Sequence, residues 1–142
     1  NNISYYKPFV HQHLGEISET LMQHQKRETV LHFLPIRGNF TRGIFATAYT
    51  DFEGTLEEAY SIYNKFYETS TFTTVSKNSL ALKQVVNTNR CMIHLHLHNK
   101  KLLITSIIDN LLKGASGQAV ENMNLMFGIT QNTGLQLKST SF

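Results

Sequence analysis

The strongest constraint on the fold is a strict alternation of apolar and polar side chains along residues 91–98. Successive side chains of a β-strand point to opposite faces, so the alternation predicts a strand with one apolar and one polar face. Asn99 and Lys100 then supply a turn into a second apolar run, residues 102–108, and the two runs predict an antiparallel hairpin. The apolar face of the first strand consists of Cys91, Ile93, Leu95 and Leu97.

The polar face of that strand carries His94, His96 and His98. Three imidazoles on one face suggest zinc, but no Cys, Asp or Glu accompanies them there. A half-polar sheet face at the surface or at a subunit contact is the simpler interpretation. Cys91 is the single cysteine, which excludes an internal disulfide framework, and on the apolar face it is expected to be an inert buried thiol.

The remaining patterns predict helices and short strands around the hairpin. Thr55 and Glu58 have the spacing of a capping box, and a helical apolar period follows them. An earlier helix is expected through Ile17 and Leu21. Helices packed on one face of a mostly antiparallel sheet make an α+β domain, expected to span residues 1–142. Short strands are predicted over residues 29–34, 43–50, 70–75 and 80–86.

Residues 108–128 carry the most functional information. The apolar run stops at Asp109, a small-residue loop follows at 114–117, and a helix is expected with Ser116 as N-cap and Gly128 as its stop. A strand, a glycine loop and a helix N-terminus form a generic site for an anion or the polar groups of a cofactor. An ordinary capped helix is the alternative. On the helical wheel an apolar arc opposes a polar one: Ala119, Val120, Met123, Met126 and Phe127 against Gln118, Glu121, Asn122 and Asn124.

Two groups of polar residues are candidates for chemistry. His11 or His13 beside Glu16 would form an acid–base pair, because a carboxylate orients and tunes an imidazole. In an extended backbone the two histidines project to opposite sides, so they are not expected to bind one metal together. Arg37 and Arg42 suit bidentate binding of a phosphate or carboxylate. Surface histidines and solvated loop arginines are the alternatives.

Composition narrows the functional classes. Of the 142 residues, 41% are hydrophobic and 16% charged, which favours a folded domain over a disordered chain. The absence of a long apolar run and of a signal-peptide pattern predicts a cytoplasmic protein without a membrane span. A net charge of +3 with scattered Lys and Arg argues against nucleic acid. Without a Gly-x-Gly-x-x-Gly or phosphate-loop motif, the chain looks incomplete as an enzyme.

Four stretches carry a resemblance to a known family. His-x-His-x-x-Glu-Ile at residues 11–17 is similar to that family's His-x-His-x-Pro-Glu-Ile, although Gly15 replaces the usual proline and loosens the turn. Residues 33–49 resemble its proline loop and Arg-Gly-Ile-Leu-Ala-Thr strand, residues 82–91 its Lys and Asn-x-Cys, and residues 108–128 its C-terminal signature. The family is that of the N-acetyl-gamma-glutamyl-phosphate reductases, arginine-biosynthesis enzymes of the semialdehyde dehydrogenase superfamily.

The resemblance implies the second domain of a two-domain enzyme, with a fold like the C-terminal domain of glyceraldehyde-3-phosphate dehydrogenase. A Rossmann domain ahead of Asn1 is then expected to bind NADP and to carry the catalytic cysteine. That cysteine attacks the acyl phosphate, expels phosphate and forms a thioester, which hydride from NADPH reduces to the aldehyde. The second domain supplies a histidine for proton transfer, binds the N-acyl-glutamyl phosphate and forms a homo-oligomer through its sheet.

Carried over residue by residue, the resemblance favours His11 over His13 for proton transfer, with Glu16 as the orienting partner. Arg37 and Arg42 become the substrate-binding residues. The acyl group, the preference for NADP over NAD, and dimer versus tetramer stay open. By itself the 142-residue chain is expected to be inactive, and the alternative function is an inert binding or oligomerisation module with the same fold. The expected cofactor-binding residues are Gly114, Ser116, Gly117, Gln118 and Asn122.

Overall fold

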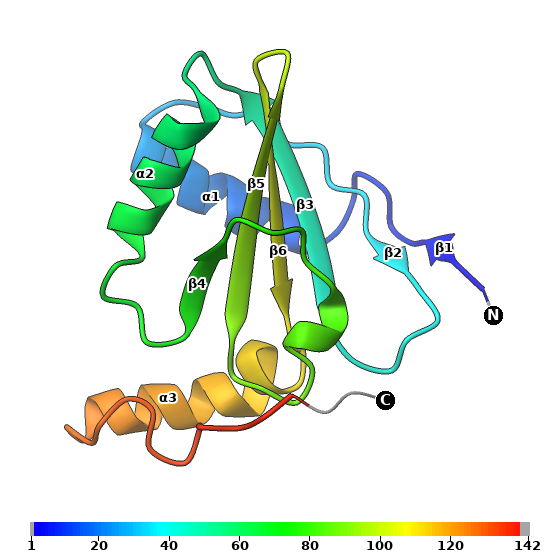
Figure 1. The fold of residues 1–142 in the computed structure, drawn as a ribbon. Coiled ribbons are helices and arrows are strands. Elements are labelled where there is room, and N and C mark those ends of the chain that lie inside the picture. Colours follow the sequence, from blue (N-terminus) through cyan, green and yellow to red (C-terminus); the bar gives the residue numbers. More distant parts are fainter. Residues whose placement is uncertain (1, 140–142) are drawn as a thin grey trace. The chain divides into compact units, whose positions relative to one another are not determined.

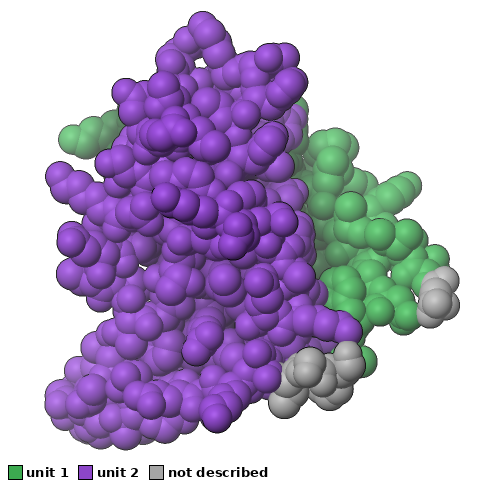
Figure 2. Space-filling model, in the orientation of Figure 1, with its two compact units in different colours: residues 1–41 green, residues 42–142 purple. Residues whose placement is uncertain are grey.

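The computed structural model describes residues 2–139 of a chain that forms two compact units, residues 1–41 and 42–142 (Figure 2). Each unit has its own sheet, of two strands in the first and four in the second. Among residues 2–139, no helix has the length and apolar character that crossing a membrane requires. The expected single domain over residues 1–142 stays a prediction.

The first unit combines one helix with a short ladder. β1 (Ser4–Tyr5) pairs antiparallel with β2 (Ile36–Arg37), and α1 (His13–Gln25) lies between them in sequence. The strand predicted over residues 29–34 is wrong. That segment meets the N-terminal residues through isolated backbone hydrogen bonds, such as Phe9 N to Phe33 O at 3.0 Å. It therefore has no continuous ladder to join, whatever its β-propensity.

The second unit is built on a sheet in the order β3-β6-β5-β4 (Figure 1). The predicted hairpin is confirmed, because β5 (Cys91–His98) and β6 (Lys101–Ile108) pair antiparallel. Asn99 and Lys100 have φ of 45° and 61°, as a two-residue hairpin turn requires. β3 (Ile44–Asp51) adds an antiparallel edge and β4 (Thr73–Ser76) a parallel one. The α+β class with a mostly antiparallel sheet is thus confirmed.

Helix α2 (Leu56–Phe66) packs on the face of the sheet that carries the core. Its Ala59 is buried in one cluster with Ile93, Leu95 and Leu102. The helix begins where the sequence predicts, because both halves of the capping box form. Glu58 N donates to Thr55 Oγ1 at 3.2 Å, and Thr55 N donates to Glu58 Oε2 at 2.7 Å.

Residues 80–86 are not the predicted strand. They contain a 3₁₀ turn, η1 (Leu82–Gln84), followed by the buried Val85 and Val86. The Gln84 side chain accepts from Ala81 N at 2.8 Å, so a local hydrogen bond replaces the strand ladder. Val85 and Val86, which belong to the predicted strand, are instead buried directly after this turn.

The predicted loop at 114–117 is also wrong, because a π-helical turn, η2 (Leu112–Ser116), runs directly into α3 (Gly117–Met126). Ser116 has helical φ and ψ of −63° and −37°, and it is not an N-cap. Its hydroxyl donates to Leu111 O at 2.8 Å. The predicted stop at Gly128 agrees with the structure: its φ is 66°, and the amides of residues 128 and 129 close a Schellman motif.

Replacing Thr55 by Ala is expected to lower the free energy of unfolding by about 1 kcal/mol, because the first turn of α2 loses its side-chain acceptor. Urea denaturation followed by circular dichroism measures the difference. Thr55→Ser keeps the hydroxyl and is the matched control. Equal losses in the two variants would contradict the capping role.

Candidate functional site

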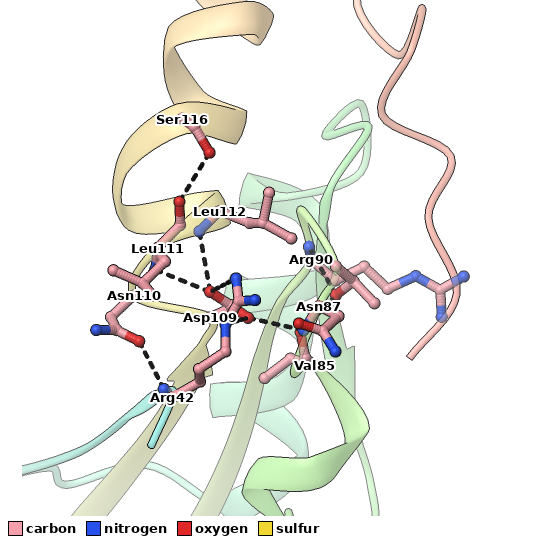
Figure 3. Close-up of polar contacts among 11 residues, drawn as sticks. Arg42, Val85, Asn87, Arg90, Asp109, Asn110, Leu111, Leu112 and Ser116 are labelled. Atoms are coloured by element: carbon pink, nitrogen blue, oxygen red, sulfur yellow. Dashed lines mark hydrogen bonds and ion pairs between the residues drawn. The ribbon is translucent and has the colours of Figure 1, made fainter. Parts of the chain in front are cut away.

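Asp109 is the centre of the most connected polar cluster in the second unit (Figure 3). It follows β6 directly and its side chain has no exposed surface. Oδ1 accepts from Leu111 N at 2.8 Å and from Leu112 N at 2.9 Å. Oδ2 accepts from Asn87 N at 2.7 Å. Arg42 completes the cluster, with Nη2 3.2 Å from Oδ1 and Nε 3.1 Å from Oδ2.

Asp109 is therefore the cap of the last helical segment, a role that the sequence suggested for Ser116. Burial raises the pKa of its carboxyl. The amides of Asn87, Leu112 and Leu111 and the Arg42 guanidinium outweigh that effect, so the net pKa lies below its ordinary value. The neighbouring Asn110 accepts from Gly43 N at 2.6 Å through Oδ1, which fixes the start of β3 to the same point.

A second buried carboxylate, Glu121, holds α3 to the rest of this unit. Its Oε2 accepts from Lys113 Nζ at 2.7 Å and from Asn89 Nδ2 at 2.9 Å, and Oε1 accepts from Gln131 Nε2 at 2.8 Å. Burial raises the pKa of Glu121, but Lys113, Gln131 and Asn89 outweigh it and the net pKa is lowered. Gly117 fits here because an added Cβ would collide with Asn89 Oδ1.

Burial on α3 does not follow the apolar arc of the helical wheel. From its polar arc, Glu121 and Asn124 are buried. From its apolar arc, Met126 and Phe127 are 80% and 74% exposed. Asn124 is satisfied because Nδ2 donates to Gln131 O at 3.1 Å and to the Thr133 carbonyl at 3.0 Å. The helix is attached through polar groups, and its apolar side is left uncovered.

The predicted catalytic histidines meet in the first unit. The His11 and His13 rings lie 4.6 Å apart in an edge arrangement, so the expectation that they project to opposite sides is wrong. The reason is that α1 begins at His13, which turns the backbone out of an extended path. His11 also contacts Phe33 and Tyr6, with ring centroids 5.2 and 5.5 Å away. Arg37 lies over the Tyr6 ring at 4.1 Å.

The electrostatics of this cluster favour a neutral His11. Desolvation, then the nearby His13 and Lys7, lower the pKa of His11, while Glu16 raises it. His13 N donates to His11 Nδ1 at 3.3 Å. In the neutral ring Nδ1 is thus the acceptor and Nε2 carries the proton. Glu16 acts on His11 through its charge, and orientation of His11 by Glu16 stays a prediction.

The predicted binding residues differ in their availability. Arg37 belongs to the first unit, and Arg42 to the second, where Asp109 occupies its guanidinium. The predicted cofactor residues lie on η2 and α3, but the amides of Gly114 and Ser116 already donate within the helical turn. The amides of Gly114 and Ser116 are therefore not free to bind an anion, as unpaired amides at a helix start would be. Gln118 donates to Asn122 Oδ1 at 3.0 Å. The binding roles of all these residues stay predictions.

The three histidines of β5 have separate environments. His94 Nδ1 lies 3.1 Å from both Tyr60 Oη and Ser76 O, whereas His96 and His98 are exposed. Within residues 2–139, no three His, Cys, Asp or Glu side chains are grouped so that they could hold a metal ion.

Residue types alone could not have identified Asp109 and Glu121 as the organising carboxylates. The one signal in the sequence concerns Asp109, an acidic residue directly after an apolar strand.

Comparison with known proteins agrees with this fold class. The family described as semialdehyde dehydrogenase, dimerisation domain, matches residues 1–110. The chain belongs to this family. Its match takes in both histidines of the His11 cluster and ends directly after Asp109.

Several curated relatives match over the whole chain. The N-acetyl-gamma-glutamyl-phosphate reductase of Christiangramia forsetii is 57% identical over 143 residues. The proteins of the same name from Azobacteroides pseudotrichonymphae and Flavobacterium johnsoniae are 55% and 54% identical. In each case all of this chain is covered but only 44% of the relative. The chain thus spans less than half the length of these relatives.

Replacing Asp109 by Asn is expected to lower the free energy of unfolding at pH 7 by about 3 kcal/mol, because Arg42 loses its buried partner. The folded-state pKa of Asp109 lies below its ordinary value of 3.8, so its stabilisation is present above that pH and is lost as the pH falls through the folded pKa. The difference between variant and wild type should therefore narrow on acidification. Urea denaturation at a series of pH values measures it.

Asp51→Asn is the matched control, because the Asp51–Lys101 pair is exposed and solvent screens its attraction, so its loss should change stability little. A loss as large in Asp51→Asn as in Asp109→Asn would contradict the central role of Asp109.

His11 is expected to titrate below its ordinary value of 6.5. Replacing His13 by Asn removes one repelling charge and should raise the His11 pKa, while desolvation still keeps it below 6.5. Proton NMR of the imidazole signals measures both midpoints. His24→Asn, at the far end of α1, should leave His11 unchanged. A His11 midpoint that does not respond to His13 would contradict the coupling.

Proposed function

We propose that this chain acts as the substrate-binding and dimerisation domain of an N-acetyl-gamma-glutamyl-phosphate reductase. That enzyme uses NADPH to reduce N-acetyl-glutamyl phosphate to the semialdehyde, with release of phosphate, in arginine biosynthesis. The proposal depends mainly on one observation: the whole chain matches proteins of that name at 51–57% identity while spanning 44% of their length. A cytoplasmic location is part of the proposal.

In this proposal a Rossmann domain outside residues 1–142 binds NADP and carries the nucleophilic cysteine. Cys91 suits that role poorly. Its Sγ lies 3.5 Å from Ser106 Oγ, and it packs against the core cluster under α2. Its hydrogen-bond partner Ser106 is a hydroxyl and not a base that could form the thiolate. The isolated chain is therefore proposed to be inactive.

His11 is proposed to be the proton-transfer residue of this domain. Its lowered pKa keeps the imidazole neutral near pH 7, and the His13 amide holds the tautomer with hydrogen on Nε2. Such a ring presents its Nε2–H donor to an oxygen that gains negative charge during acyl transfer, and it can give that proton to the oxygen. Arg37, lying over Tyr6 in the same unit, is the proposed contact for the substrate's anionic groups.

Two exposed apolar surfaces support a larger assembly. On β3, Phe45 and Tyr49 are 48% and 75% exposed along one sheet face, the face proposed to meet a second copy. On α3, the exposed Met126 and Phe127 are proposed to meet the nucleotide-binding domain. Neither a membrane nor a nucleic acid is a proposed partner.

Replacing His11 by Asn in the complete natural protein is expected to lower kcat by about 10²–10³, because a positioned proton-transfer group is lost. NADPH oxidation with N-acetyl-glutamyl phosphate measures it. His24→Asn, on the same helix, should retain full activity. If the complete wild-type protein self-associates without any turnover, the alternative of an inert oligomerisation module replaces this proposal.

A further inference from the structure

A groove in the second unit is lined by none of the residues of the Asp109 and His11 clusters. Its volume is about 510 Å³, within the range of small-molecule sites. One wall comes from β4, the start of β5 and the segment before them, and the other from residues 132–138. The buried side chains of Phe72 and Leu135 line it together with the half-buried Met92.

Among the described residues that line this groove, the charged ones are both cationic. Arg90 lies on the strand wall and Lys138 on the C-terminal wall, and none of the lining residues in the described range 2–139 carries a carboxylate. Neither cation forms an ion pair within residues 2–139. Figure 3 shows the Arg90 side chain extending away from the Asp109 cluster toward the C-terminal segment. Thr74 and Gln136 add neutral hydrogen-bonding groups to the lining.

The buried carboxylate of Glu121 does not neutralise these cations. Glu121 is occupied by Lys113, Asn89 and Gln131. The two groove cations therefore face water, with the fork of Arg90 able to bind a planar or tetrahedral oxyanion through two parallel hydrogen bonds.

We propose that this groove is a binding site for a small organic anion. Its phosphate or carboxylate group binds to Arg90, with Lys138 adding charge from the opposite wall. Its apolar part lies on Phe72, Met92 and Leu135. Such a ligand combines the two features of the groove, since an inorganic ion alone would leave the apolar lining unused.

The site is linked by hydrogen bonds to α3. Thr71 Oγ1, on the strand wall, donates to Gln131 Oε1 at 2.7 Å. Gln131 Nε2 in turn donates to Glu121 Oε1 at 2.8 Å. The C-terminal wall starts at the segment that Asn124 holds through the carbonyls of Gln131 and Thr133. A ligand that bridges the two walls therefore stabilises residues 131–138 and, through Glu121, the position of α3.

Isothermal titration calorimetry of the complete natural protein with phenyl phosphate and with inorganic phosphate tests the proposal. Phenyl phosphate should bind about tenfold more tightly than phosphate, because its ring covers the apolar lining. Arg90→Ala should weaken phenyl phosphate about tenfold or more, and Arg90→Lys should weaken it less. Arg27→Ala is the matched control, because it removes the same charge from an exposed residue of the first unit.

Hydrogen exchange locates the ligand independently of any enzymatic activity. Bound phenyl phosphate should slow exchange across residues 131–138 in the wild type and not in Arg90→Ala. Absence of binding at millimolar phenyl phosphate, or equal weakening by Arg27→Ala and Arg90→Ala, would overturn the proposal. Neither result bears on the proposed reductase activity, which is measured in a separate assay.

Discussion

The ion pair between Asp109 and Arg42 joins the elements on which the second unit depends. One carboxylate follows β6, caps the helical segment that comes next, holds the loop at Asn87 and pairs with Arg42, two residues before β3. Removing a charge from water costs several kcal/mol, and only a full set of donors repays that cost. Asp109 has such a set, three amides and a guanidinium, so its burial is tolerated. The geometry of the hairpin end and of α3 is thereby coupled to a single side chain.

Glu121 is a second buried carboxylate whose charge is satisfied by hydrogen bonds, and it positions α3. Because Lys113, Asn89 and Gln131 hold it, the helix is positioned by directional bonds and not by an apolar stripe. Hydrogen bonds fix rotation about the helix axis more narrowly than apolar packing does, since each bond tolerates only a small angular range. Gly117 reflects the tightness of this arrangement, because only hydrogen fits beside Asn89.

The sequence predicted best those elements whose partners are local. The β5–β6 hairpin and the capping box of α2 follow from residues within a few positions of one another, and both are confirmed. Failures occurred where distant partners decide. The segment 29–34 lacks a ladder to join. The closeness of His11 and His13 has a local reason instead, because α1 begins at His13. Nothing in residues 117–126 alone reveals that Asn89 and Gln131 satisfy the polar side of α3.

The burial pattern of α3 is the most informative departure from a local rule. In a self-contained domain, an amphipathic helix buries its apolar arc, because each exposed methionine or phenylalanine forgoes roughly 1.5–3 kcal/mol of burial. Here Met126 and Phe127 remain exposed while Glu121 is buried at electrostatic cost. Such a break of a local rule is expected where a surface serves a further contact. The chain spans 44% of its relatives' length, so a further domain of such a protein is the proposed occupant of that arc. Polar anchoring then has a physical purpose: it holds the helix in place before its apolar side meets that partner.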